Sequence, residues 1–175
     1  MRQASLRAVF KLAKKDKKIV HAYGAAAKGS TVLNYVNITE KDIDFILFFN
    51  SRNIRRKQIP DTMLAYRHFI DKLPIEQAKK CVLVLHTERV SEHGTDLEAV
   101  IELLLNGDQY NVIFTDARFD PSQMNMLYNS TNCQILLTSN EGWGLSLTEA
   151  ILVGNPIIAN VTGGMQDQMR FVDYR

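Results

Sequence analysis

SNEGWGLSLTEAILVGNP, residues Ser139–Pro156, reads as a strand end, a glycine-rich loop, a helix and the turn into a next strand. Gly142 and Gly144 allow the backbone to approach a ligand closely, because glycine has no Cβ. Ser146 and Glu149 have the spacing of a capping box, which predicts a helix beginning near Ser146. The free amides of its first turn and the helix dipole favour an anion.

Two carboxylates bracket this loop, Glu141 and Glu149, with seven residues between them. A carboxylate on each side of a pocket can accept hydrogen bonds from the hydroxyls of a sugar or a ribose. A glutamate three residues after a serine is also what an ordinary helix cap requires. The pair by itself therefore leaves a purely structural role open.

The composition is that of a folded protein with one domain, or one domain and a fragment. The chain has 175 residues, of which 46% are apolar, and a formal net charge of +2, too small to predict a nucleic-acid partner. Cys81 and Cys133 lie in apolar runs, which indicates buried thiols in a reducing compartment. No apolar run reaches the roughly 18 residues of a membrane span. We expect a soluble cytoplasmic protein, and the spacing of the histidines and cysteines predicts no zinc site.

Strand and helix patterns alternate along the chain. We expect strands at 18–23, 43–49, 80–86, 110–115, 132–138 and 156–160. The helices between them have roughly 10 residues, and two more of them have predicted capping boxes, Thr95 with Glu98 and Asp120 with Gln123. This alternation predicts an α/β fold with a Rossmann-like parallel sheet, covered by helices on both faces. Ligands of such sheets bind at the carboxyl ends of the strands.

The first part of the chain gives weaker signals. Residues 2–16 predict a basic amphipathic helix with a small apolar face. A solvated helix is the favoured interpretation, and contact with a membrane surface is the alternative. GAAAKGST, Gly24–Thr31, follows the strand expected at 18–23 as in a Rossmann-like unit. Ser30 stands where a Walker loop needs lysine, so close packing on small residues explains this loop at least as well as ligand contact.

EGWGLSLTEAILVGNPIIA closely resembles the donor-sugar motif of retaining, nucleotide-sugar-dependent glycosyltransferases of the family-four type. The resemblance spans about residues 45–173 and implies one half of a two-domain GT-B fold. It implies a hexosyltransferase-like enzyme of polysaccharide biosynthesis that transfers a sugar from a nucleotide-sugar to an acceptor with retention. It also implies that no bound metal or other cofactor takes part. The base, the sugar, the acceptor and the oligomeric state stay undetermined.

The same resemblance implies roles for particular residues. In this family an arginine, and a lysine five positions later, follow the first strand of the donor domain, and Arg52 and Lys57 have that spacing. They would hold the diphosphate and stabilise its charge as it leaves. Glu141 would bind sugar hydroxyls and Glu149 the ribose. Backbone amides would contact the sugar and the phosphates of the donor, and these amides belong to Gly142, Trp143, Gly144, Leu145, Ser146 and Leu147.

A purely structural role is the alternative for several of these residues, and for the basic residues taken without the downstream motif it is the favoured one. Arg52, Arg55, Arg56 and Lys57 together could form only a solvated basic loop, and Arg55 and Arg56 are expected on the surface. The indole of Trp143 could pack on a sugar or fill the core.

KIVHAYGAAAKGSTVLNYVNITEKDIDFI, about residues 18–46, is similar to the C-terminal domain of sugar C-methyltransferases, which use S-adenosylmethionine. The methyl-donor domain and zinc-binding cysteines of such enzymes are missing, so we expect no methyl transfer by this chain. We expect a partial Rossmann-like segment at 1–43 and a donor-binding domain at 44–175 that ends early. The chain would be a fragment or a junction of two genes. A non-catalytic nucleotide-sugar binding module and a methyltransferase accessory domain are the alternative functions.

Overall fold

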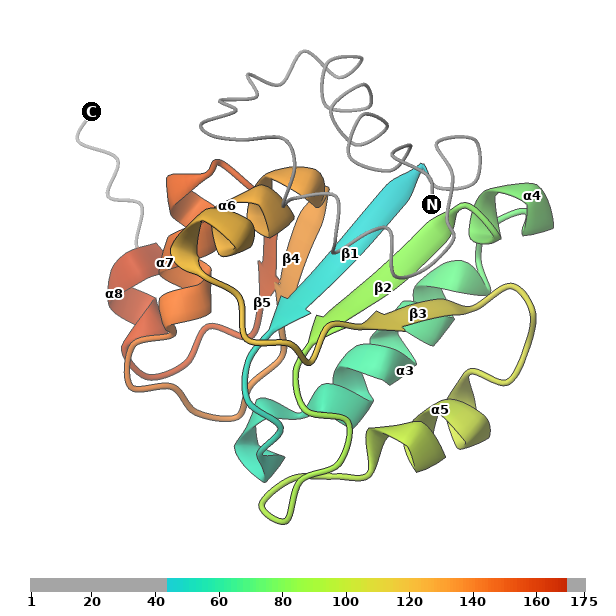
Figure 1. Cartoon of the computed structure of the whole chain (residues 1–175), viewed down its shortest axis with the longest axis horizontal. Coiled ribbons are helices and arrows are strands. Elements are labelled where there is room, and N and C mark those ends of the chain that lie inside the picture. Colours follow the sequence, from blue (N-terminus) through green and yellow to red (C-terminus); the bar gives the residue numbers. More distant parts are fainter. Residues whose placement is uncertain (1–43, 170–175) are drawn as a thin grey trace.

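The apolar runs of the sequence form the strands of one parallel sheet (Figure 1). The computed structural model describes residues 44–169. Within them lie β1 (Phe45–Asn50), β2 (Cys81–His86), β3 (Asn111–Phe114), β4 (Cys133–Leu136) and β5 (Ile157–Ala159). The expected helix at 2–16, strand at 18–23, glycine loop at 24–31 and domain division after residue 43 fall outside the described residues.

The strand order is β3-β2-β1-β4-β5, and every neighbouring pair is parallel. From β1 the chain moves outward through β2 to β3, then crosses to the other side of β1 to add β4 and β5. β1 and β4 are therefore neighbours whose crossovers leave in opposite directions. Ligands of open α/β sheets bind in the crevice that this reversal leaves beyond the carboxyl ends of the two strands.

The helices cover both faces of the sheet (Figure 1). They are α3 (Ile59–Ile70), α4 (Ile75–Ala78), α5 (Leu97–Leu104), α6 (Pro121–Ser130), α7 (Leu145–Leu152) and α8 (Met165–Met169), with a short 3-10 turn η1 (Arg55–Lys57). α3 and α5 pack on one face against Leu47 and Phe49. α6 and α7 pack on the other face against Ile46 and Phe48.

The alternation of side chains along β1 explains this two-sided core, because successive residues of a strand point to opposite faces. A strand buried on both faces needs a continuous apolar run, which FILFFN and CVLVLH supply. The predicted fold class is confirmed, and each of the five strands expected between 43 and 160 is present with its ends shifted by at most two residues. Cys81 and Cys133 are buried, as expected.

The helix starts follow the predicted capping in one case and depart from it in another. Asp120 and Gln123 form the predicted capping box of α6. The capping box predicted at Thr95 is wrong, because Asp96 caps α5 and accepts from the amides of Glu98 and Ala99. The buried Asn53 side chain holds the backbone of Thr95. The Thr95 amide donates to Oδ1 of Asn53 at 3.0 Å, and the Thr95 carbonyl accepts from Nδ2 of Asn53 at 2.6 Å. Asp96 is thus the first residue free to act as the cap.

Candidate functional site

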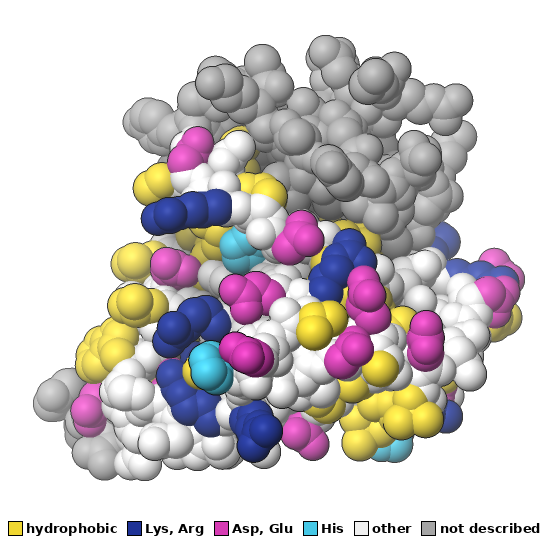
Figure 2. Space-filling view, turned by 60° about the horizontal axis from the view of Figure 1, so that its bottom comes forward, with side chains coloured by type: hydrophobic (Ala, Val, Ile, Leu, Met, Phe, Trp, Pro, Cys, Tyr) yellow, Lys and Arg dark blue, Asp and Glu magenta, His cyan; other side chains and the backbone are white. Residues whose placement is uncertain are grey.

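A cavity of about 970 Å³ opens beyond the carboxyl ends of the strands. Segments that follow β1, β2 and β3 line it, together with the loop after β4 and the first turns of α7. Lys and Arg side chains gather at the edge of the molecule that faces the viewer in Figure 2. The cavity thus lies where the strand order predicts a ligand.

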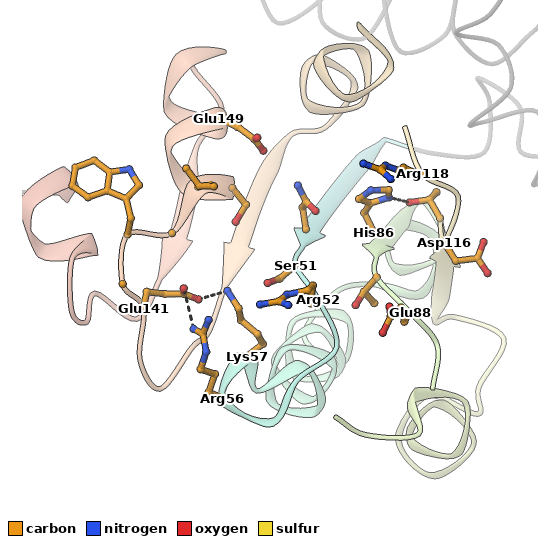
Figure 3. Close-up of a pocket in the computed structure, with 18 of the residues that line it drawn as sticks. Ser51, Arg52, Arg56, Lys57, His86, Glu88, Asp116, Arg118, Glu141 and Glu149 are labelled. Atoms are coloured by element: carbon orange, nitrogen blue, oxygen red, sulfur yellow. Dashed lines mark hydrogen bonds and ion pairs between the residues drawn. The ribbon is translucent and has the colours of Figure 1, made fainter. Parts of the chain in front are cut away.

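Three charged side chains join the loop after β1 to the loop after β4. Nζ of Lys57 donates a hydrogen bond to Oε1 of Glu141, and Nη1 of Arg56 lies 3.0 Å from Oε2 of the same carboxylate (Figure 3). The Lys57 and Glu141 side chains are only 9% and 4% exposed. The predicted site residues Lys57 and Glu141 are therefore in direct contact, although 84 residues separate them.

The environment of Glu141 keeps its carboxyl ionised. Burial by itself would raise the pKa of Glu141. Hydrogen bonds from Lys57 and Arg56 and the positive charges of both outweigh burial, so the pKa lies below its ordinary value. The carboxylate is therefore a fixed negative charge at neutral pH that holds two cations in place.

Arg55 and Arg56 both lie at the surface, as expected, and Arg56 also has partners on the loop after β4. The Arg56 side chain is 40% exposed, and its guanidinium contacts Glu141 and donates to the Asn140 carbonyl at 2.5 Å. The Arg56 carbonyl accepts from the Ser139 amide at 2.8 Å and the Thr138 hydroxyl at 3.0 Å. Arg56 therefore fastens the two loops together through both side chain and backbone.

Arg52 reaches the same cavity without a protein partner. Its side chain is exposed, lines the cavity and lies beside Lys57 in Figure 3. Within residues 44–169 its guanidinium makes no hydrogen bond and no ion pair. Arg52 is thus a cation at the cavity whose donors have no protein partner in the described part of the chain.

The helix after the glycine loop begins one residue earlier than predicted and without the predicted cap. Gly144 is its N-cap, in the left-handed conformation with φ 84°, and no side chain caps the helix. The capping box of Ser146 and Glu149 is wrong, because the turn at Gly144 already places Ser146 inside the helix. Glu149 accepts instead from the Tyr128 hydroxyl at 2.6 Å. The uncapped start of α7 borders the cavity and presents the positive end of its dipole.

A second glycine pair supports the EGWG loop from behind. The Gly164 amide donates to the Glu141 carbonyl at 3.0 Å. A Cβ on Gly164 would lie 1.8 Å from the Gly142 carbonyl oxygen, and one on Gly163 would lie 2.0 Å from the Glu141 carbonyl oxygen. Only glycine allows these two backbones to pass so closely.

Trp143 borders the cavity but is anchored to the helix. Its Nε1 donates to the Thr148 hydroxyl at 2.9 Å, and its carbonyl accepts from the Gln168 side chain. The residue is 48% exposed, so it does not fill the core.

The far wall of the cavity is made by residues after β2 and β3. Nδ1 of His86 lies 2.9 Å from the Thr115 hydroxyl oxygen. The His86 ring stacks on the Phe119 ring, with 4.9 Å between the ring centroids. Burial lowers the pKa of His86, so its imidazole is neutral at pH 7. Asp116 and Arg118 lie beside it (Figure 3), and their only sequence signal is their place after a strand. No group of His, Cys, Asp and Glu within residues 44–169 is arranged to hold a metal ion.

The comparisons with known families agree with this architecture. The family model described as Glycosyl transferases group 1 matches residues 37–170, and the model of the C-methyltransferase C-terminal domain matches residues 1–68. No curated protein matches the chain.

Solved structures share the fold at low sequence identity. The C-terminal domain of a glycosyl transferase group 1 family protein (LpcC) from Francisella tularensis has a TM-score of 0.60 and 18% identity, covering 86% of this chain and 72% of that one. WaaG, a glycosyltransferase involved in lipopolysaccharide biosynthesis, has a TM-score of 0.60 and 20% identity over 83% of this chain and 36% of that one. A trehalose-6-phosphate structure from E. coli bound with UDP-2-fluoro glucose has a TM-score of 0.58 and 15% identity over 94% of this chain and 37% of that one. The chain thus spans little more than a third of the two longer proteins.

The glycine contact behind the loop predicts that Gly164→Ala destabilises the fold. The added methyl group would meet backbone atoms that cannot move aside, which costs roughly 1–3 kcal/mol in the free energy of unfolding. Gly142→Ala is the matched control, because a Cβ there meets nothing within 4 Å. We expect it to stay within about 0.5 kcal/mol of wild type. Urea denaturation measures both, and equal effects of the two substitutions would contradict the prediction.

The buried ion pair predicts that Glu141→Gln leaves Lys57 uncompensated, at a cost of about 3 kcal/mol at pH 7. A carboxyl with a lowered folded pKa contributes stability above its unfolded pKa and loses it as the pH falls through the folded pKa. The difference from wild type should therefore shrink as the pH falls below 4.5, the ordinary value. Glu102→Gln, an exposed change in α5, is the control. A difference that does not depend on pH between 7 and 3 would contradict this prediction.

Proposed function

The chain belongs to the group 1 glycosyl transferases, and from this premise we propose that residues 44–169 bind the donor of a retaining, nucleotide-sugar-dependent transfer. The observation that carries the proposal is the convergence of Arg52, Lys57 and Glu141 on one cavity at the start of α7. These residues come from two loops that meet where the strand order reverses. The acceptor is a glycan or another molecule of unknown identity.

The proposed chemistry is electrostatic. As the glycosidic bond breaks, the leaving nucleoside diphosphate gains negative charge. Arg52 and Lys57, with the amides from Gly142 to Ser146, would stabilise that charge more in the transition state than in the ground state. The Leu147 amide, expected to take part, instead donates to the Gly144 carbonyl at 2.9 Å. Arg52 can hold two phosphate oxygens at once, while Lys57 acts as a point charge. No bound metal and no other cofactor is part of the proposed reaction.

Glu141 can contact the sugar without releasing its cations. Each of its oxygens has one cationic partner, Lys57 on Oε1 and Arg56 on Oε2. An ionised carboxylate has about four acceptor positions, so about two remain for sugar hydroxyls. Glu149 would accept from the ribose, since it is exposed at the same cavity.

Two other functions have one supporting observation each. A donor-binding module without transfer would use the same cavity and the same cations. A methyltransferase accessory domain is favoured by the family match at residues 1–68. Donor binding without transfer or hydrolysis by any longer form of the protein supports the first. Methylation of a sugar nucleotide only when this chain is present supports the second.

The direct test of transfer uses the full-length gene product with a panel of UDP-, GDP-, ADP- and dTDP-sugars. We expect sugar-nucleotide turnover with retained anomeric configuration and its loss in Glu141→Ala and Lys57→Ala. Both variants also disturb the buried ion pair, so their folding is measured in parallel.

Arg52→Ala tests the proposed site without that complication, because the Arg52 side chain has no partner within residues 44–169. Loss of one charge-assisted phosphate contact should weaken the binding of a nucleoside diphosphate by roughly tenfold or more in calorimetry, with the unfolding midpoint unchanged. Arg55→Ala is the matched control, an exposed arginine three residues away that does not line the cavity. Equal effects of the two substitutions would remove the support for an anion site at Arg52.

A further inference from the structure

Under the floor of the cavity, three side chains form a continuous hydrogen-bonded chain. Nδ2 of Asn50, at the end of β1, donates to the Tyr128 hydroxyl at 2.8 Å. The Tyr128 hydroxyl donates to Oε2 of Glu149 at 2.6 Å. The chain links β1, α6 and α7, the three elements around the point where the sheet order reverses.

Tyr128 is a rigid member of this chain. The residue is 2% exposed, and its ring packs edge-on against Phe48 with 5.1 Å between centroids. Its carbonyl accepts from the Thr131 hydroxyl at 3.0 Å, which fixes the backbone end of the residue. Burial and the adjacent Glu149 carboxylate raise the pKa of Tyr128, so the hydroxyl keeps its proton.

The direction of the hydrogen bonds orients the carboxylate. The Asn50 amide occupies a lone pair of the phenol oxygen, so the single phenol proton points toward an acceptor. Glu149 at 2.6 Å is closer than the alternative, the Ser146 carbonyl at 3.2 Å. Within residues 44–169, Oε1 of Glu149 accepts no hydrogen bond. One oxygen of Glu149 is thus fixed from below, and the other is available at the cavity.

We propose that Tyr128 is a positioning residue that holds Glu149 in the orientation needed to accept hydrogen bonds from the ribose hydroxyls of the donor. The inference rests on the proposed function, because it assigns the donor's ribose to Glu149. Exposed carboxylates rotate freely, and holding one in advance lowers the ordering cost of binding. A tether that only joins α6 to α7 would stabilise the fold without affecting which nucleotide binds.

The test separates ribose recognition from folding. Calorimetry with the full chain measures the dissociation constants of UDP, GDP and ADP and of their 2′,3′-dideoxy counterparts. The ribose preference is the dissociation constant of the dideoxy nucleotide divided by the dissociation constant of the matching ribose nucleotide. Tyr128→Phe keeps the ring and its packing on Phe48 and removes only the hydroxyl. We expect the ribose preference to fall by roughly fivefold to tenfold, while affinity for the dideoxy nucleotides is unchanged.

Tyr110→Phe is the matched control. The Tyr110 hydroxyl also donates to a carboxylate, that of Asp71, and neither residue lines the cavity. We expect this variant to keep the wild-type ribose preference. In a double-mutant cycle, Tyr128→Phe should weaken ribose binding no further once Glu149→Gln is present, because Tyr128 acts through Glu149.

The outcomes distinguish the inference from the proposed function. If wild type binds neither these nucleotides nor dTDP, the donor-binding proposal fails and the inference fails with it. If wild type prefers ribose and Tyr128→Phe keeps that preference, only the inference is overturned. Equal weakening of ribose and dideoxy nucleotides would mark Tyr128 as a structural tether and would also overturn it.

Discussion

The contact between Glu141 and its two cations joins the loops that follow β1 and β4, beside the cavity at the carboxyl ends of the strands. Removing Lys57 and Glu141 from water costs several kcal/mol per ion, which their attraction does not reliably recover. The cluster is therefore better explained by geometry than by stability. It fixes the loop after β1 against the loop after β4, and the Arg56 carbonyl adds two hydrogen bonds from Thr138 and Ser139 to the same junction.

The strands cannot carry this chemistry themselves. β1, β2 and β4 are covered on both faces, so their interior positions are apolar or otherwise buried. Charged side chains therefore lie in the segments that follow the strands, and the parallel arrangement brings those segments to one edge. Residues as distant in sequence as Arg52 and Glu149 line one cavity for this reason.

The features that local sequence determines were predictable. The apolar runs gave the strands, and Asp120 with Gln123 gave the cap of α6. The starts of α5 and α7 were misplaced because Asn53 holds Thr95 from 42 residues away and Gly144 takes a left-handed conformation. The contact of Arg56 with Glu141 could not be predicted either, since it depends on a partner 85 positions along the chain (141 − 56). Asp116 and Arg118 belong to no motif.

The charges around the cavity are unevenly distributed. Arg52, Arg56 and Lys57 line its β1 side against the single carboxylate Glu141, an excess of two positive charges. Glu88 and Asp116 line the side formed after β2 and β3, with Arg118. At short range such separation orients a charged ligand, because the energy of an anion differs between the two ends. The β1 side, beside the start of α7, is therefore the more favourable end of the cavity for an anion.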